Sequence, residues 1–399
     1  MKILYIHQYF NTPSMPGSTR SYEFAKRLVE RGDTVYMVTS NWQGRSSVSF
    51  SNISGINIYW APVRYTNKMN YFARIFSYFA YLWYVLTLGM KLKYDLIIAS
   101  STPLTVAMPA IILKTIKRAK LVFEIRDLWP QLPIAIGVLK SSILKNMALY
   151  LEQKVYTNSD QIIVLSPGMA TELNGKVHNR KLSVITNLSD LHRFQIPAKK
   201  GIKFRENFPE IANNPLVLYA GAFGRINRVS YLVEIAGEIK KINPNIRFLL
   251  AGDGYEKERI VEHAKELNLL NNTLLIKDYF PKDQMPKLLS ASTITTSFFL
   301  DLKEMEHNSA NKFFDGLAAG KPIMINYGGW QADLLLEHKA GFIIPNNNSL
   351  EAAKILNDVI IHDNSLQTMG QAARSLANRF DIDTNYAKFK TVIDRAHLA

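Results

Sequence analysis

The chain has 399 residues, enough for two or three domains, and its 47% hydrophobic and 20% charged residues are ordinary for a soluble protein. It contains no cysteine, which excludes disulfide bonds and thiolate catalysis and fits a reducing compartment. Most of the net charge of +15 lies in residues 1–195, which carry 23 basic and 10 acidic residues. This half is therefore expected to face an anionic partner: a phosphorylated substrate, a membrane surface or nucleic acid.

The first half of the chain alternates short apolar strands with helices. The strands are predicted at Ile3–Ile6, Val35–Thr39, Asn57–Trp60, Leu96–Ala99, Leu121–Ile125 and Ile162–Leu165. An amphipathic helix over Ser21–Arg31 stops at Gly32. This alternation predicts a parallel, doubly wound sheet. The apolar run after Lys2 ends at His7, so no secretory signal is expected and the protein should be cytoplasmic.

The loop His7–Arg20 follows the first strand and opens into a helix near Ser18. It lacks the Gly-x-Gly-x-x-Gly pattern of dinucleotide enzymes, so nicotinamide or flavin binding is not expected. Gly17 allows a close backbone approach, and Arg20 could contact a phosphate. An ordinary helix start is the alternative.

Residues 75–90 form an uncharged run rich in Phe, Tyr and Trp. The run is shorter than a membrane-spanning helix. Its basic flanks suit a helix lying in a membrane interface, and a core helix under the sheet is an equally good interpretation. The flanking residues are Arg64, Lys68, Arg74, Lys91 and Lys93.

Arg126 and Asp127 follow the strand Leu121–Ile125 directly. Charged side chains at the carboxyl end of a parallel strand often bind ligands. The alternative is an ion pair, either between these two residues or with Glu124, that only shapes the loop.

A second series of strands begins at Leu216–Tyr219 and ends at Phe342–Ile344. The charged, proline-containing segment Gln195–Pro215 is interpreted as a linker. The fold class is therefore α/β, with two Rossmann-like, doubly wound domains facing across a cleft: residues 1–195 and 196–383. The C-terminal helix, about 384–399, is expected to pack back on the first domain.

Two loops of the second domain are candidates for nucleotide binding. Gly224, Arg225 and Arg228 follow its first strand, in a pattern that suits a diphosphate. Gly252 and Gly254 form a tight turn after the next strand, which could pass close to a base or could be a plain strand-to-helix connection.

The segment His307–Pro322 reads as a polar loop, a helix and a sharp stop. Ser309 is the predicted N-cap, and Gly320 stands where a helix ends in the left-handed conformation. The free N–H groups of such a helix suit an anion, and Lys312 adds a positive charge there. Asn311 and Asp315 share a face, so the carboxylate could bridge two ribose hydroxyls. The segment predicts a nucleotide-sugar site.

No metal site is expected, because the eight histidines show no ligand spacing. Asp381-Ile382-Asp383 matches an Asp-x-Asp pattern formally, but we interpret it as a helix start.

Together these motifs resemble the family 4 glycosyltransferases of the GT-B fold over essentially the whole chain. The resemblance rests on the loop ending at Gly17, Arg126-Asp127-Leu128-Trp129-Pro130, Val164-Leu165-Ser166-Pro167-Gly168-Met169, Ile185-Thr186-Asn187-Leu188-Ser189-Asp190, Gly252-Asp253-Gly254 and Asn311–Pro322. It looks closest to WbuB-like enzymes of O-antigen and capsule synthesis, which are associated with N-acetylfucosamine transfer.

The resemblance implies retaining transfer from a nucleotide sugar, commonly a UDP-sugar, with no cofactor or metal required. Asp315 takes the second of two glutamate positions of the family and would hold the ribose. The first position falls on His307, and Glu306 or Glu304 could replace it. Where the family often places an Arg and a Lys on the diphosphate, this chain has Ala222 and Asn227, so Arg225, Arg228 and Lys312 are the substitutes.

The predicted catalytic residues are thus Arg225, Lys312, Asp127 and Glu306. The predicted donor-binding residues are Gly17, Gly224, Arg225, Arg228, Gly252, Gly254, Ser309, Asn311, Lys312 and Asp315. Arg20, Arg126 and Asp127 are expected on the acceptor side. The expected acceptor is a polyprenyl-diphosphate-linked saccharide, reached by peripheral contact with the inner face of the cytoplasmic membrane.

Two alternatives stay open. A UDP-sugar 2-epimerase would share the two domains. A basic nucleic-acid-binding protein would explain the charge, but not two domains with phosphate-binding loops at strand ends, so no nucleic-acid partner is expected.

Overall fold

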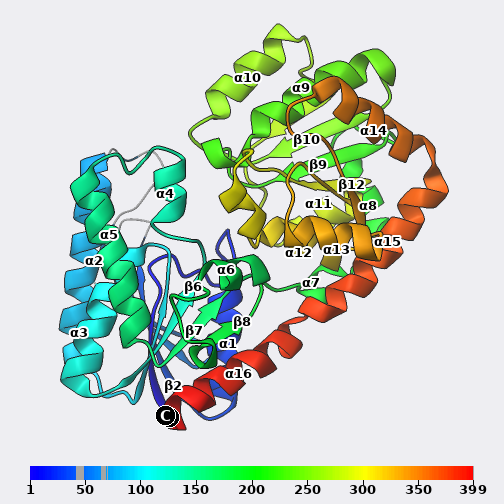
Figure 1. Ribbon diagram of the computed structural model, residues 1–399. Helices are drawn as coiled ribbons and strands as arrows, with labels where there is room; N and C mark the ends of the chain where they lie inside the picture. The colour runs from blue at the N-terminus through cyan, green and yellow to red at the C-terminus, as the bar shows by residue number, and fades with distance from the viewer. Residues whose placement is uncertain (42–48, 64–68, 70, 399) are drawn as a thin grey trace. The chain divides into compact units, whose positions relative to one another are not determined.

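The computed structural model describes residues 1–41, 49–63, 69 and 71–398. The chain forms two compact units, Met1–Thr186 with Asp383–Ala399 and Asn187–Ile382 (Figure 1). The boundary therefore lies at Thr186 rather than at the expected residue 195. The segment expected to be a linker is part of the second unit, where it forms helix α8 (Ala198–Arg205) and buries Phe204 and Ile211.

The first unit is built on an eight-stranded sheet with the order β3-β4-β2-β1-β5-β6-β7-β8. All neighbouring strands are parallel except β3, which pairs antiparallel with β4. Apolar side chains at nearly every position of β1 and β5 explain why both faces of the sheet are covered. The strands are β1 (Lys2–Ile6), β2 (Thr34–Ser40), β3 (Ser49–Ile53), β4 (Ile56–Ala61), β5 (Leu96–Ser100), β6 (Lys120–Ile125), β7 (Gln161–Val164) and β8 (Leu182–Val184).

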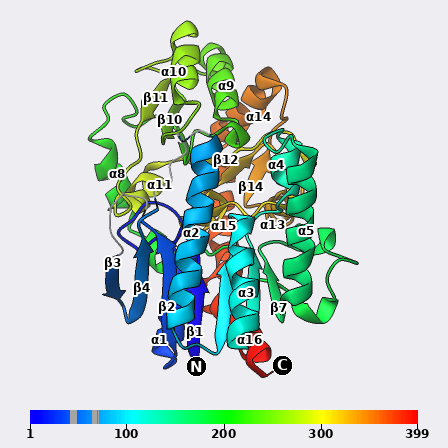
Figure 2. The same cartoon turned by 90° about the vertical axis from the view of Figure 1, so that its left-hand side faces the viewer.

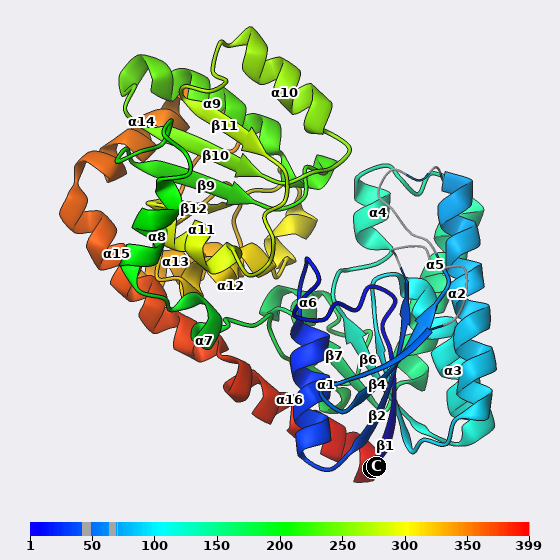
Figure 3. The same ribbon diagram turned by 180° about the vertical axis from the view of Figure 1, so that it is seen from behind.

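Helices cover both faces of this sheet. On one face α2 (Tyr71–Lys91), α3 (Ala107–Lys117) and α5 (Ser142–Asn158) lie side by side (Figure 2). On the other face α1 (Arg20–Glu30) lies beside the C-terminal helix α16 (Ile382–Leu398), as Figure 3 shows. The rings of Phe24 and Phe389 stack with centroids 4.4 Å apart, and Arg27 pairs with Asp383. Two short helices, α4 (Gln131–Ala135) and α6 (Pro167–Glu172), complete the unit.

The second unit contains a six-stranded, fully parallel sheet with the order β11-β10-β9-β12-β13-β14. Its strands are β9 (Leu216–Ala220), β10 (Arg247–Ala251), β11 (Leu274–Lys277), β12 (Ile294–Ser297), β13 (Ile323–Ile325) and β14 (Gly341–Ile343). Its remaining helices are α7 (Leu191–Phe194), α9 (Val229–Ile242), α10 (Lys257–Glu266), α11 (Met285–Ala291), α12 (Asn311–Ala318), α13 (Trp330–His338), α14 (Ser349–Ile361) and α15 (Asp363–Ala377). The strands predicted for both halves are confirmed, and β3 and β8 are additional.

The aromatic run of residues 75–90 forms most of α2. Ser77, Tyr81 and Val85 are buried against the sheet, as a core helix requires. No helix among the described residues is long and apolar enough to cross a membrane. Arg64 and Lys68, expected as basic flanks, lie outside the described residues, as does the side chain of Arg74.

Candidate functional site

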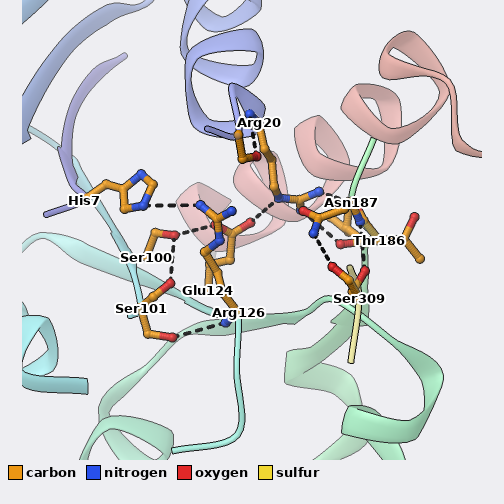
Figure 4. A network of polar contacts seen from close by, with 11 residues as sticks. His7, Arg20, Ser100, Ser101, Glu124, Arg126, Thr186, Asn187 and Ser309 are labelled. Carbon is orange, nitrogen blue, oxygen red and sulfur yellow. Dashed lines mark hydrogen bonds and ion pairs between the residues drawn. The ribbon is translucent and has the colours of Figure 1, made fainter. Parts of the chain in front are cut away.

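The predicted N-cap Ser309 does not cap a helix. Helix α12 begins at Asn311 after Ala310, which has no side chain that could cap it. Ser309 is instead buried as an acceptor for Asn187: its Oγ accepts from the Asn187 backbone N–H at 3.3 Å, and its carbonyl accepts from the Asn187 side-chain amide at 2.5 Å (Figure 4). The first turn of α12 is thus left without a capping side chain, which keeps its N–H groups available to an anion. The helix stops as expected, with Gly320 at φ +64.

Lys312, in the first turn of α12, points into a cage of neutral groups. Its Nζ donates to Asn227 Oδ1 at 3.1 Å and to the Tyr219 hydroxyl at 3.3 Å. The same ammonium lies over two rings, 4.7 Å from the centroid of Tyr219 and 5.1 Å from that of Phe299. Burial lowers the pKa of Lys312 to about 7. A partly buried ammonium whose hydrogen-bond partners are neutral is the arrangement that an anionic ligand would stabilise.

The two arginines predicted for the diphosphate differ in how they are held. Arg225 is exposed at the start of a short 3-10 turn, Arg225–Asn227, at the carboxyl end of β9. Arg228 is partly buried, donates to Asn346 Oδ1 and lies 4.8 Å from the ring centroid of Tyr231. The structure therefore joins Lys312 to Asn227 by a hydrogen bond, and Arg225 and Arg228 lie on either side of Asn227 in the same loop.

Gly252 and Gly254 pack against the neighbouring loop of their own unit. A Cβ on Gly252 would lie 1.9 Å from the carbonyl oxygen of Gly221, and one on Gly254 would lie 2.6 Å from that of Phe223. Of the two readings of this turn, close packing of the β9 and β10 loops accounts for its glycines. Gly224 is less constrained, because its Cβ would meet only the Asn227 side-chain amide, at 3.3 Å.

Asp315 lies one turn below Lys312 on α12 and is half-buried. Burial raises the pKa of its carboxyl to about 7, with Arg193 and Lys282 acting in the opposite direction. Asn311 is exposed at the helix start. Burial thus raises the pKa of the Asp315 carboxyl and lowers the pKa of the Lys312 ammonium, and both reach about 7.

Glu306 and His307 end the 3-10 segment Lys303–His307 that precedes α12. Both are partly exposed. The backbone of Glu306 packs against Gly329, where a Cβ would lie 2.4 Å from the Glu306 carbonyl oxygen. This contact fixes the position of the segment and leaves the Glu306 carboxylate near Gly328, since a Cβ there would lie 3.6 Å from Oε1.

In the first unit, three neighbouring strands bring polar side chains to one edge of the sheet. His7 follows β1, Ser101 and Thr102 follow β5, and Arg126 and Asp127 follow β6. Arg126 donates to His7 Nε2 at 3.2 Å and from its backbone N–H to Ser101 Oγ at 3.1 Å (Figure 4). Thr102 donates to Asp127 Oδ2 at 3.0 Å. Arg126 and Asp127 remain partly exposed, which leaves them accessible to a ligand.

Arg20 cannot contact a phosphate in the way that the sequence suggested, because its side chain is fully buried. Its Nε pairs with Glu124 Oε1 at 2.9 Å, and its other nitrogens donate to the carbonyls of Ile185 and Thr186. Burial raises the pKa of Glu124, but Arg20 and Arg126 more than offset that effect, so the pKa lies below its ordinary value. Glu124 thus forms a buried ion pair with Arg20, a partner that neither interpretation of the Arg126–Asp127 loop had named.

Gly17, also expected to bind the donor, lies in an exposed part of the first unit's first loop with φ +103. A Cβ there would lie 2.7 Å from the Asn11 side-chain amide, so the loop conformation itself needs glycine. Among the described residues no group of three or more His, Asp or Glu side chains could hold a metal ion.

Sequence reasoning missed several residues of both sites. His7 is buried, and burial together with Arg126 lowers its pKa to about 3, so it is neutral and accepts at Nε2. Asn346 is not among the predicted residues, yet its Oδ1 accepts from Asn326 at 2.8 Å as well as from Arg228. The position of His7 at the carboxyl end of a strand was a usable signal. Tyr219, Phe299 and Asn346 carried none.

Family models and curated relatives cover most of the chain. Residues 17–193 match the model described as Glycosyltransferase Family 4, and residues 202–376 match the model described as Glycosyl transferases group 1. The probable glycosyltransferase WbjE of Pseudomonas aeruginosa is 22% identical over 324 residues, which are 79% of this chain and 76% of that protein.

Solved structures match over the whole length. Sucrose-phosphate synthase from Thermosynechococcus elongatus has a TM-score of 0.78 at 16% identity, covering 99% of this chain and 98% of the other. Anabaena Alr3699/HepE, solved in complex with UDP and glucose, has a TM-score of 0.74 at 18% identity, covering 99% of each chain. These likenesses show the fold, two parallel-sheet α/β domains of the GT-B architecture.

Proposed function

We propose that this chain, a family 4 glycosyltransferase of the GT-B type, transfers a sugar from a UDP-sugar donor to a lipid-linked saccharide with retention at the anomeric carbon. The observation that carries the proposal is Lys312, a partly buried ammonium held by neutral partners at the uncapped start of α12. A diphosphate would supply the missing negative charge. The structure of Anabaena HepE with UDP and glucose supports a nucleotide sugar as the donor.

The donor side of the reaction would lie in the second unit. Lys312, Arg225 and the N–H groups of α12 would stabilise the negative charge that develops on the leaving diphosphate, in the role that a metal ion plays in other transferases. Arg228 would add charge from its fixed position beside Asn346. Asp315 would accept hydrogen bonds from two ribose hydroxyls.

The transferred sugar would be oriented from the segment before α12. Glu306 and His307 stand there, and the carboxylate of Glu306 is the group that could accept from sugar hydroxyls. We propose an N-acetylated amino sugar such as N-acetylfucosamine as the donor sugar, in the synthesis of a cell-surface polysaccharide such as O-antigen or capsule.

The acceptor would bind the first unit, at the edge where Arg126 and Asp127 lie. Its hydroxyl oxygen forms the new bond to the anomeric carbon on the face from which the phosphate oxygen departs. The hydroxyl proton passes to the leaving phosphate oxygen, so no protein base is required. Asp127 is the group that would take the proton in its place, and its hydrogen bond from Thr102 fixes its orientation.

The test is a panel of UDP-, GDP- and dTDP-sugars offered with a short polyprenyl-diphosphate-linked acceptor, with the products identified by mass. A glycosylated acceptor and one free UDP for each transfer are the expected products. Conversion of the donor into its 2-epimer, with no acceptor consumed, would identify the epimerase of the same fold instead. Hydrolysis of the donor without transfer to any lipid-linked acceptor would contradict the proposed acceptor and would still agree with the proposed donor site.

A further inference from the structure

Helix α2 carries two apolar stripes, and the fold uses only one of them. Tyr81, Val85 and Gly89 face the sheet and α3, where Gly89 is so close to Leu113 that a Cβ would lie 2.4 Å from its side chain. The opposite stripe is exposed: Phe76, Phe79 and Trp83 have exposed fractions of 75%, 59% and 70%. A helix that presents large aromatic side chains to solvent along a whole face needs a partner to cover them.

Helix α5 presents a second exposed stripe on the same side of the sheet. Ile143, Met147 and Tyr150 follow one another at helical spacing and are all exposed. Between α2 and α5 lies α3, in contact with both, which exposes Ile112 and Ile116 (Figure 2). We call the exposed apolar residues of α2, α3 and α5 the three-helix face.

The charge on these helices has one sign. Helices α2 and α3 contain no Asp or Glu, and the single acidic residue of α5, Glu152, is buried and accepts from Gln131 and Tyr156. Lys140 and Lys154 are exposed at and near the face, and the Lys154 ammonium lies 5.2 Å from the ring centroid of Tyr150. Aromatic and aliphatic side chains among lysines, with no exposed carboxylate on the helices, fit an anionic lipid surface.

The topology puts the apolar part of this face next to the proposed acceptor site. Helices α2 and α5 follow strands of a parallel sheet and run back along it, so their first turns lie at the carboxyl edge of the sheet. Phe76 and Phe79 are in the first half of α2, and Ile143 and Met147 are in the first half of α5. Arg126 and Asp127 stand at the same edge, at the end of β6.

We infer that the three-helix face docks on an anionic membrane and inserts Phe76, Phe79 and Trp83, with Ile143, Met147 and Tyr150, into its interface. Docking would hold the carboxyl edge of the first sheet at the lipid surface. This inference rests on the proposed function at one point only: a lipid-linked acceptor gives a reason for this face to lie at a membrane. The surface itself stands on exposure and charge.

Vesicles of equimolar phosphatidylglycerol and phosphatidylcholine test the inference with the whole protein. The wild-type protein should float with these vesicles at low salt and much less with pure phosphatidylcholine, because the lysines contribute through charge. Phe76→Ser and Met147→Ser should each lower vesicle affinity by about tenfold, since each removes one inserted side chain. Leu336→Ser and Ile361→Ser are the matched controls, since both residues are exposed to a similar degree on α13 and α14 of the second unit.

Trp83 gives a direct readout of insertion. Brominated lipids should quench the tryptophan emission of the wild-type protein on binding, and Trp83→Phe should abolish most of this quenching. Binding that is equal for the variants and the controls would overturn the inference. So would a dimer that forms without vesicles, detected by light scattering, and that Phe76→Ser dissociates, because a second copy would then cover the face.

The two proposals fail separately. Turnover of the donor with a soluble, short-chain acceptor should be unchanged in Phe76→Ser, since that side chain is exposed on α2 and is not among the residues proposed to bind the donor or the acceptor. Vesicle binding without any sugar transfer would leave the docking surface intact and contradict the proposed function.

Discussion

The guanidinium of Arg20 and the carboxylate of Glu124 form an ion pair 2.9 Å long in the interior of the first unit, and neither side chain is exposed. Each partner is also tied to other groups. Ser100 donates to Glu124 Oε2 at 2.6 Å, and Arg20 donates to the carbonyls of Ile185 and Thr186, the last two residues of the unit before the chain leaves it. The pair therefore connects the start of α1, two strands and the exit of the chain.

Removing one member of this pair should destabilise the first unit strongly. Glu124→Gln leaves the buried Arg20 charge uncompensated, so the free energy of unfolding should fall by about 3–5 kcal/mol. Urea denaturation measures it. The control is Asp383→Asn, which breaks the pair of an exposed aspartate with Arg27 and should change stability by less than about 1 kcal/mol. If both variants lost a similar free energy of unfolding, burial of the Arg20–Glu124 pair would not add to the stability of the first unit.

Lys312→Met should separate function from stability. The pKa of Lys312 in the folded chain, about 7, lies below its ordinary value, so between these values the unfolded chain binds more protons and stability rises with pH. Near pH 7 the buried charge therefore opposes folding. The substitution should raise the free energy of unfolding by about 1–2 kcal/mol while donor turnover falls by at least about a hundredfold.

Lys321→Met is the matched control for that variant. Burial also lowers the pKa of Lys321, to about 8, but its ammonium donates to the carbonyls of Ser290 and Ser292 at 2.8 and 2.7 Å. Its removal should destabilise the second unit and leave the Michaelis constant for the donor unchanged. A Lys312→Met variant that keeps near-normal turnover would contradict the diphosphate assignment.

Donor affinity should have a bell-shaped pH dependence centred near pH 7. Binding favours a charged Lys312, which loses its proton above its pKa of about 7, and an ionised Asp315, which gains one below its pKa of about 7. Titration calorimetry of UDP binding from about pH 5.5 to about pH 8.5 measures both limbs. Lys312→Arg should flatten the alkaline limb and Asp315→Asn the acid limb. An affinity independent of pH would mean that neither group touches the nucleotide.

Asp315→Asn should also weaken donor binding by about tenfold at neutral pH, because an amide accepts through one oxygen only and its NH₂ group opposes a ribose hydroxyl hydrogen. The deoxyribose analogue dUDP, which keeps only the 3′ hydroxyl, should lose less affinity than UDP through the same substitution, since one of the two hydrogen bonds is already missing. A loss that is the same for UDP and dUDP would place Asp315 away from that hydroxyl.

Gly252→Ala should damage the nucleotide loops through packing alone. The new Cβ would lie 1.9 Å from the backbone carbonyl of Gly221, which cannot move without displacing the loop after β9. Stability should fall by about 2–3 kcal/mol, measured by thermal unfolding. The control is Gly237→Ala in α9, where the nearest atom is the flexible Leu267 side chain at 3.2 Å and the helix should gain up to about 1 kcal/mol.

The architecture could be predicted because each buried strand is a short apolar run between helices, and both sheets follow from that pattern. The predictions that were wrong concern residues whose contacts come from distant parts of the sequence. Arg20 reads as a phosphate ligand until Glu124, more than a hundred residues later, is placed beside it. Ser309 reads as a helix cap until Asn187 occupies its oxygen atoms.

The candidate donor site likewise has a part that could be predicted from the sequence and a part that could not. The helix that carries Lys312 and Asp315 could be predicted from the sequence, and their roles in donor binding stay a prediction. The groups that set their properties could not be predicted, because Tyr219, Asn227 and Phe299 come from three other segments and have no distinguishing neighbours in the sequence.

A lysine amine that is half deprotonated at neutral pH is a nucleophile, and Lys312 is such an amine. Amine-selective acylating reagents or aldehydes should therefore modify Lys312, because burial lowers its pKa to about 7. A bound UDP-sugar would restore its charge and shield it. The burial that lowers the pKa of Lys312 thus also makes it a site for covalent probes. Protection of Lys312 by the donor against such a probe would measure occupancy of the site in intact cells.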